Sequence, residues 1–259
     1  DNKILGKYFY ENRTHVEYSD LSPDLINALI ATEDERFFNH SGIDFIALIR
    51  VVKGIITNNT SLGGGSTITQ QLAKMFFSKK PSSRIDRVKQ KFKEWIIAVR
   101  IERQYSKEEI IAMYLNRFDF LNLAVGIKSA SKIYFNKSPI DLTIQESATL
   151  VGMAKNPSLY NPLRRLEKTE KRRNVVLNQM VKNNYLSKYI RDSLIMLPLV
   201  LNYKKADHNE GQATYFREQL RAFMTDWAKK REAETGEKYN IYKDGLKIYT
   251  TIDSKMQKY

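Results

Sequence analysis

Apolar and polar positions follow a helical period along most of the chain. After Ser22-Pro23, a pair typical of a helix start, apolar residues recur at intervals of three and four through Ile30. The same period predicts further helices over 44–58, from Ser66-Thr67 onward, and over 84–104, 106–116, 124–135, 143–154, 166–184, 187–196 and 212–235. The pattern therefore predicts a mainly α fold with short connections between the helices.

Local signals mark several helix ends. Ser106 with Glu109, and Thr143 with Glu146, have the spacing of capping boxes, in which each side chain bonds the backbone of the other residue. Gly236 is a typical C-cap for the helix over 212–235. We therefore expect these helices to begin and end close to the predicted residues.

The last sixty residues differ in composition from the rest. Beyond residue 200 the chain becomes more polar and contains several tyrosines, and two β-prone runs flank Asp244-Gly245, a pair typical of a hairpin turn. We therefore divide the chain into a helical domain over 1–200 and a linker segment over 201–259. This segment is expected to hold a helix and a small β-hairpin.

The predicted helix over 44–58 is unusually apolar. Its apolar side chains cover more than one face, and after Asp44 its only charges are Arg50 and Lys53. Such a helix is either buried in the core or lies against lipid on one side. Burial is the commoner case, and we expect it from the pattern alone.

Composition and charge indicate the class of partner. The 259 residues have a globular composition and a formal net charge of +14, which favours nucleic acid, an anionic membrane surface or a phosphate-bearing substrate. The absence of cysteine excludes disulfides and a thiolate nucleophile. The three histidines, His15, His40 and His208, lack the spacing of a helical metal site.

The sequence shows no membrane-spanning segment and no signal-peptide pattern. Its longest apolar run, 194–201, is interrupted by Pro198 and is too short to cross a bilayer. We expect either a soluble protein or one whose membrane anchor precedes Asp1.

The stretch from Ala31 to Gly42 holds the first candidate for catalysis. Glu33, Asp34 and Glu35 stand next to two phenylalanines and are followed by His40. A carboxylate held partly out of water by apolar rings is suited to proton transfer. By itself, however, the stretch is more typical of a solvated, acidic helix end.

Two later stretches carry candidate anion-binding groups. Glycines 63–65 precede Ser66-Thr67 at a helix start, where backbone N–H groups can bind an anion, and Lys74 follows two turns later. No Gly-Lys-Ser/Thr follows the glycines, so the stretch is not a Walker P-loop, and an ordinary capped loop also explains it. The helix over 84–104 is strongly basic around a central acid, Glu94, which an ordinary ion-paired surface would explain as well.

Taken together, these motifs resemble the peptidoglycan glycosyltransferase domain of class A penicillin-binding proteins, glycosyltransferase family 51. The first family motif, E-D-x-x-F-x-x-H-x-G, is present from Glu33 to Gly42, and the second, G-x-S-T-x-T-Q-Q in loose form, lies within 64–71. The third, R-K-x-x-E-x-x-x-A, is met by Lys91, Glu94 and Ala98.

The remaining motifs follow in the family's order. The fourth resembles Tyr114-Leu115-Asn116 and a later one the stretch 146–162, so the resemblance covers roughly residues 10–200. Gln90 stands where the third motif has arginine, and Arg87, one helical turn earlier, is the candidate to replace it. The tail resembles the linker that precedes a transpeptidase domain, and no transpeptidase serine motif is present in this chain.

The resemblance implies a lysozyme-like helical fold and an inverting glycosyl transfer. The family polymerises lipid II: the 4-hydroxyl of an acceptor sugar attacks C1 of a donor and displaces a lipid-linked pyrophosphate, which forms a β-1,4 bond. Glu33 matches the general base, and Glu94 matches a second glutamate that supports the leaving group, directly or through a metal. No cofactor is required by the resemblance, although Mg²⁺ or Mn²⁺ is an option.

The resemblance also implies a set of substrate-binding residues. They are Asp34, His40, Gly65, Ser66, Thr67, Gln70, Gln71, Lys74, Arg87, Lys91 and Asn116. The cations are expected to neutralise the pyrophosphate, and the hydroxyl and amide groups to bond sugar or phosphate. His40 is expected to orient the loop that follows Glu33 rather than to transfer protons.

The implied partners are lipid II, the growing glycan chain, a membrane surface and a moenomycin-type inhibitor. The implied location is the outer face of the cytoplasmic membrane in the bacterial envelope, where the helix over 44–58 would dip into the lipid interface. Two alternatives remain. One is a muramidase or lytic transglycosylase on a related fold, and the other is a nucleic-acid-binding helical domain, which explains the charge but not the ordered motifs.

Overall fold

The computed structural model describes residues 15–57, 64–77, 83–204, 213–242 and 244–253, with Leu5 and Met256. Gly63, His208 and the side chains of Val52 and Ile55, which entered the sequence arguments, lie outside the described parts. The chain divides into two compact units, one formed by Arg13–Lys204 and the other by Asp1–Asn12 with Lys205–Tyr259. The predicted boundary after residue 200 stays a prediction.

Helices dominate both units, as expected from the sequence. The helices of the larger unit are α1 (Pro23–Glu33), α2 (Phe45–Ile56), α3 (Ile68–Phe77), α4 (Arg84–Gln104), α5 (Lys107–Arg117), α6 (Ile127–Ala130), α7 (Ile144–Ala154), α8 (Leu166–Lys182) and α9 (Lys188–Met196). The smaller unit contains α10 (Thr214–Thr235). In the described residues, β-pairing is limited to one isolated bridge between Asp119 and Val125. The mainly α fold is therefore confirmed.

Most helix ends form as the local signals predict. Both capping boxes are present, Ser106 with Glu109 and Thr143 with Glu146, and Gly236 ends α10 with a φ of 73°. Ser22 is an exception, because its hydroxyl donates to Leu142 O (3.2 Å) instead of capping α1. The start of α1 is therefore tied to the start of α7 by a contact that no local rule could predict.

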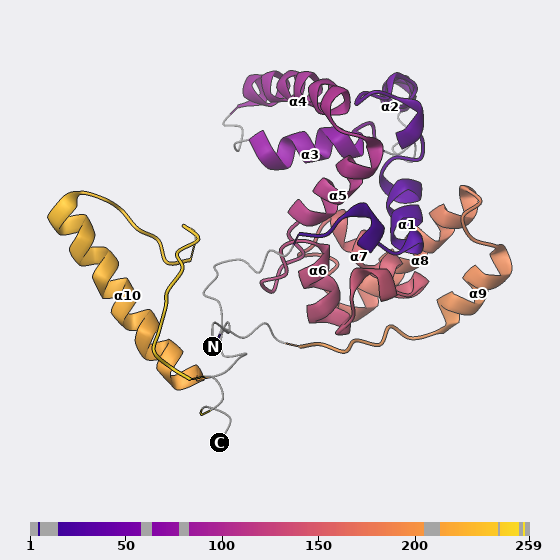
Figure 1. Ribbon diagram of the computed structural model, residues 1–259. Coiled ribbons are helices and arrows are strands. Elements are labelled where there is room, and N and C mark those ends of the chain that lie inside the picture. Colours follow the sequence, from indigo (N-terminus) through magenta and orange to yellow (C-terminus); the bar gives the residue numbers. More distant parts are fainter. Residues whose placement is uncertain are drawn as a thin grey trace. The chain divides into compact units, whose positions relative to one another are not determined.

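The larger unit has two groups of helices (Figure 1). In one, α1 packs against α7 and α8, which also pack against each other, and their apolar faces form the core. In the other, α3 lies against α4, with α2 near them, and α3 also packs on α5. Glu33 ends α1 and accepts a hydrogen bond from Gln71 on α3 (2.8 Å). The fold therefore brings the first motif to the helices that carry the second and third.

The predicted burial of α2 is wrong. Phe45, Ile46, Ile49 and Ile56 each expose 65–78% of their surface, whereas Ala47 on the opposite face is buried. The helix lies at the edge of its group, so only one of its faces finds a protein partner. No helix in the described parts of the chain is long and apolar enough to cross a membrane.

The predicted C-terminal hairpin does not form in the described residues. A turn ends at the first of the two expected turn residues: Asn240 O accepts from Asp244 N–H (3.1 Å), and the following Gly245 has a φ of 66°. The flanking segments form no strand in residues 237–242 and 244–253. Two strands without a third partner are only marginally stable.

Candidate active site

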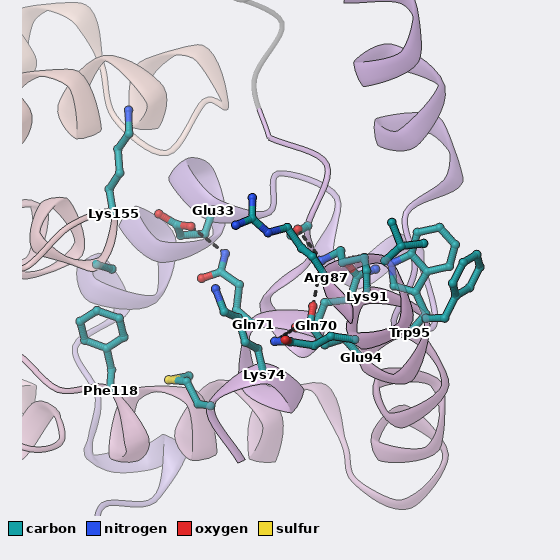
Figure 2. Close-up of a pocket in the computed structure, with 16 residues that line it drawn as sticks. Glu33, Gln70, Gln71, Lys74, Arg87, Lys91, Glu94, Trp95, Phe118 and Lys155 are labelled. Carbon is teal, nitrogen blue, oxygen red and sulfur yellow. Dashed lines mark hydrogen bonds and ion pairs between the residues drawn. The ribbon is translucent and has the colours of Figure 1, made fainter. Parts of the chain in front are cut away.

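A cavity of about 1350 Å³ lies between the two groups of helices. It is bounded by the end of α1, by α3 and α4, and by residues just after α5 and at the end of α7 (Figure 2). The lining residues are Glu33, Ser66, Gln70, Gln71, Lys74, Met75, Arg87, Val88, Gln90, Lys91, Phe92, Glu94, Trp95, Phe118, Ala154 and Lys155. Both predicted carboxylates therefore line the same cavity.

Glu33 is half-buried and makes one hydrogen bond among the described residues. Gln71 Nε2 donates to Glu33 Oε2 (2.8 Å), and Tyr114 donates its hydroxyl to Gln71 Oε1 (3.1 Å). Burial, and then the charge of Glu33, raises the pKa of Tyr114 well above its usual value. The Tyr114 hydroxyl therefore stays protonated and can act as a donor.

Glu94 has a different environment. It is only 5% exposed, and its two oxygens accept from Gln90 Nε2 (3.1 Å) and Lys91 Nζ (3.2 Å). Lys91 Nζ also donates to Ser66 Oγ (2.9 Å), which connects the second and third motifs. Glu94 is therefore placed to hold a cation at the cavity wall, whereas Glu33 keeps one oxygen open.

Four cationic side chains line the cavity: Lys74, Arg87, Lys91 and Lys155. Arg87 extends from α4 into the cavity in the direction of Glu33 (Figure 2). Gln90, which replaces the family arginine, bonds Glu94 instead of adding a charge. Arg87 lines the same cavity, and its assignment as the substitute cation stays a prediction. A cavity with more cations than acids favours an anionic ligand.

Asp34 and His40 lie outside the lining of the large cavity and connect the first motif to α3. Asp34 accepts from His40 Nε2 (3.0 Å) and from the backbone N–H of Ile68 (3.0 Å) at the start of α3. Gly42 N–H donates to His40 Nδ1 (3.2 Å), so the ring proton lies on Nε2. Neither side chain lines the large cavity. This geometry agrees with an orienting role for His40.

Gly42 joins three motifs at one point. Its carbonyl oxygen accepts from the Thr67 hydroxyl (2.7 Å) and from Gln70 Nε2 (3.3 Å). Its φ is 93°, and a Cβ at this position would come within 2.9 Å of the Ala98 carbonyl carbon and oxygen. A glycine is therefore required by both the conformation and the close approach of α4.

A smaller cavity, of about 170 Å³, also borders Glu33. Glu33 and Ser66 line both cavities, and Asp34, Gly65 and Thr67 line the smaller one. The two cavities together place most of the predicted site residues around Glu33.

Asn116 lies elsewhere. Its side-chain amide pairs with the backbone of Val16, donating to the Val16 oxygen (2.8 Å) and accepting from its N–H (3.0 Å), and it lines neither cavity. Phe37 is fully buried and Phe38 is 53% exposed, and neither ring lines a cavity. These two phenylalanine rings, which were expected to shield Glu33, therefore lie outside both of the cavities that Glu33 lines.

Several residues that line the cavity were not predicted from the sequence. Lys155 lies within the stretch 146–162 that carried a family motif, so a signal for it was present. Phe118, Met75 and Trp95 had none, because an apolar residue on a helix is most often part of a core. The function assigned to each predicted residue stays a prediction.

The donor set does not fit a metal held by protein side chains. The described residues contain no group of three or more His, Cys, Asp or Glu side chains that could hold a metal ion. The cavity contains two acids, and both oxygens of Glu94 already accept from Gln90 and Lys91.

This arrangement defines a class of protein. A half-open carboxylate and four cations in one cavity suit an enzyme that removes a proton from a hydroxyl while an anionic group departs. Glycosyl transfer from a phosphate-linked donor is a reaction of this kind.

Comparisons with known proteins identify the family. The model of the transglycosylase family matches residues 1–181. The chain is 37% identical over 257 residues to penicillin-binding protein 1A of Haemophilus influenzae, covering 99% of this chain and 29% of that protein. It is 35% identical over 257 residues to penicillin-binding protein 1A of Escherichia coli, covering 99% of this chain and 29% of that protein. The chain therefore belongs to the transglycosylase family.

One solved structure is similar as well. It is the crystal structure of penicillin-binding protein 1A from Haemophilus influenzae, with a TM-score of 0.48 and 25% identity, covering 89% of this chain and 24% of that chain. The chain spans 29–30% of the length of the first curated relatives that it matches. The family match and these relatives confirm the resemblance to the peptidoglycan glycosyltransferase domain of class A penicillin-binding proteins.

Proposed function

We propose that this domain polymerises lipid II into β-1,4-linked glycan strands, with Glu33 as the general base. The observation that carries the proposal is that Glu33 and Glu94 line one cavity together with four cations. The substrate is a lipid-linked disaccharide with a pyrophosphate, so it needs a base for its acceptor hydroxyl and positive charge for its leaving group. The cavity supplies both.

Glu33 is suited to the base role by the state of its two oxygens. Oε2 accepts from Gln71, and Oε1 receives no hydrogen bond among the described residues. In the proposed step the acceptor 4-oxygen forms a bond to C1 of the donor as its proton passes to Oε1. The C1–oxygen bond to pyrophosphate breaks on the opposite face, which inverts the α linkage to β.

The cations are suited to stabilise the departing pyrophosphate. Lys74, Arg87 and Lys155 line the cavity, and Lys91 is held at its wall by Glu94 and Ser66. Positioned charges in a partly dry site stabilise developing charge more strongly than charges in water. In this proposal Glu94 acts by holding Lys91 and Gln90, rather than by transferring a proton.

Gln70 is a candidate for direct contact with substrate. Its Nε2 donates to Gly42 O, whereas its buried Oε1 has no hydrogen-bond partner among the described residues. A buried acceptor without a partner is costly unless a ligand or water satisfies it. We assign Gln70 Oε1, at the wall of the large cavity, to binding of substrate N–H or O–H groups. Thr67 and Gly65, at the wall of the smaller cavity, are assigned to substrate binding there.

A membrane surface is the proposed partner of the exposed apolar residues. Beside α2, the neighbouring helices expose Phe76 and Phe77 on α3 and Phe92 and Ile96 on α4, each by 47–65%. A lipid-linked substrate must be taken from a bilayer, and an apolar helical face with basic residues nearby can lie in its interface. Co-sedimentation with lipid vesicles tests this assignment. The proposed location, at the outer face of the cytoplasmic membrane, rests on the family resemblance.

Product analysis tests the function. The purified chain is incubated in detergent with labelled lipid II, with and without moenomycin, and the products are separated on a gel. We expect glycan chains that lengthen with time, loss of these chains with moenomycin, and no chains from Glu33→Gln, because an amide cannot accept the proton.

Two results would contradict the proposal. Substantial polymer from Glu33→Gln would remove Glu33 from the base role. Release of soluble fragments from preformed peptidoglycan, without synthesis from lipid II, would favour a lytic transglycosylase. Circular dichroism of the Glu33→Gln variant is the control for its fold.

A further inference from the structure

Two consecutive hydrogen bonds connect three side chains from three helices, Tyr114, Gln71 and Glu33. Tyr114 on α5 donates to Gln71 Oε1 on α3 (3.1 Å), and Gln71 Nε2 donates to Glu33 Oε2 at the end of α1 (2.8 Å). Tyr114 is 1% exposed and lines neither cavity, so it has no route to substrate. Among the described residues, the hydrogen bonds of its hydroxyl reach Glu33 through Gln71.

The donors and acceptors in these two hydrogen bonds leave one low-energy arrangement. An ionised carboxylate only accepts, so Gln71 must face Glu33 with its NH₂ group and Tyr114 with its carbonyl oxygen. A rotated amide would place two acceptors, Gln71 Oε1 and Glu33 Oε2, against each other. It would also leave the Tyr114 proton without an acceptor in a buried place, which is costly.

The Tyr114 ring is held firmly. It stacks on Phe118, with ring centroids 6.0 Å apart and an interplanar angle of 30°, and Phe118 in turn contacts Phe120. The raised pKa of Tyr114 keeps its proton in place across the pH range in which an enzyme works. Tyr114 is therefore a rigid, permanent donor.

We infer that Tyr114 is a positioning residue for the reaction: its hydroxyl fixes the Gln71 amide, which occupies Glu33 Oε2 and so presents Oε1 to the acceptor hydroxyl. The inference rests on the proposed function, since it needs Glu33 to be the base. Gln71 thereby acquires a role in orienting Glu33 in addition to lining the cavity.

The test is a kinetic double-mutant cycle with lipid II. Tyr114→Phe removes only the hydroxyl, and we expect kcat to fall about tenfold, the loss typical of one buried neutral hydrogen bond, with KM within about twofold. Gln71→Met removes both of these hydrogen bonds, the one to Glu33 and the one from Tyr114, and should lower kcat at least as much. In the Gln71→Met background, Tyr114→Phe should have no further effect on kcat, because residues that act as a unit are not additive.

Tyr134→Phe is the matched control. Tyr134 is also fully buried and donates its hydroxyl to a neighbouring group, Phe120 O (2.7 Å), but it is not connected to Glu33 by the hydrogen bonds of the described residues. Its removal should cost stability of similar size and leave kcat within about twofold of the wild type. A purely structural effect of Tyr114→Phe would appear equally in Tyr134→Phe.

The outcomes separate the two proposals. If Glu33→Gln is inactive and Tyr114→Phe keeps the wild-type kcat, the positioning role alone is overturned. Losses that multiply in the double variant would overturn it as well. If Glu33→Gln remains active, the base assignment fails and the positioning role fails with it. Should Tyr114→Phe not fold, a wild-type kcat for Gln71→Met overturns the inference.

Discussion

The two acids of the cavity have opposite surroundings. Glu33 is half-buried and accepts from one amide, whereas Glu94 is nearly fully buried and accepts from Lys91 and Gln90. A base needs a free oxygen, and an anchor for cations needs close donors. The surroundings of the two acids therefore support the different roles proposed for them.

The Glu94→Gln variant should lose activity on the order of 10²-fold, because a neutral amide holds Lys91 less well than a carboxylate. Initial rates of lipid II polymerisation measure the loss. Glu102→Gln is the control: Glu102 lies on the same helix, is paired with Lys107 (2.8 Å) and lines neither cavity. A Glu94→Gln rate equal to that of Glu102→Gln would contradict the role.

Gly42→Ala should destabilise the fold by about 2 kcal/mol, because a Cβ would strain the positive φ and meet the backbone of Ala98. Urea unfolding measures the change. Gly64→Ala is the control, since a Cβ there meets nothing within 4 Å, and its cost should stay within about 0.5 kcal/mol. Equal costs for the two variants would show that Gly42 is not constrained by α4.

At the scale of elements, α2 is the helix whose sequence and environment disagree. Its apolar residues suggest a core helix, yet Ile46 and Ile49 are 65% and 68% exposed. Exposed apolar surface of this extent commonly marks an interaction site. The helices α3 and α4 also carry exposed apolar residues, among them Phe77 and Ile96.

Replacing Ile46 and Ile49 together by serine should weaken vesicle binding at least tenfold, because burying each side chain contributes about 1.5–3 kcal/mol. Co-sedimentation with vesicles that contain anionic lipid measures the partition. Met196→Ser on α9 is the control, because Met196 is 84% exposed and lies outside this surface. Unchanged partitioning of the double variant would remove α2 from the membrane contact.

At the scale of the molecule, one acid joins the two groups of helices of the larger unit. Glu35 accepts from Arg50 on α2 (2.6 Å) and from Lys182 at the end of α8 (3.0 Å). The hydrogen bonds from Arg50 and then from Lys182 lower the pKa of Glu35 below its usual value. The ionised form of Glu35 therefore stabilises the contact between α2 and the core.

Glu35→Gln should reduce the free energy of unfolding by about 1 kcal/mol at pH 7, a value typical of partly exposed ion pairs. The lowered pKa means that this contribution is present above the usual value of 4.5 and is lost as the pH falls below it. The wild type and the variant should thus converge in acid. Urea unfolding at several pH values measures this, with Asp192→Asn, a neutralised exposed surface pair, as control.

A difference that stays constant from pH 7 to pH 3 would contradict the assignment, because it would show that the charge of Glu35 is not its source. An effect of Asp192→Asn as large as that of Glu35→Gln would also contradict it, since the Asp192 pair joins neighbouring residues of one helix.

Helix positions, caps and the order of the motifs follow from residues close in sequence. The helix over 84–104 and both capping boxes form where local rules predict, because an i to i+4 period and a cap need only neighbouring residues. The first three motifs could likewise be identified, and with them Glu33 and Glu94. The predicted hairpin does not form in the described residues, because strand pairing needs more than a favourable turn.

Only the tertiary structure decides which faces remain exposed and which distant groups meet. The exposure of α2, the contact of Gly42 with Ala98, the bond of Gln90 to Glu94 and the presence of Lys155 in the cavity all depend on how helices pack. The bonds from Tyr114 through Gln71 to Glu33 join residues 43 and 38 positions apart. Local sequence rules cannot place such contacts, because packing of the whole unit determines which side chains approach one another.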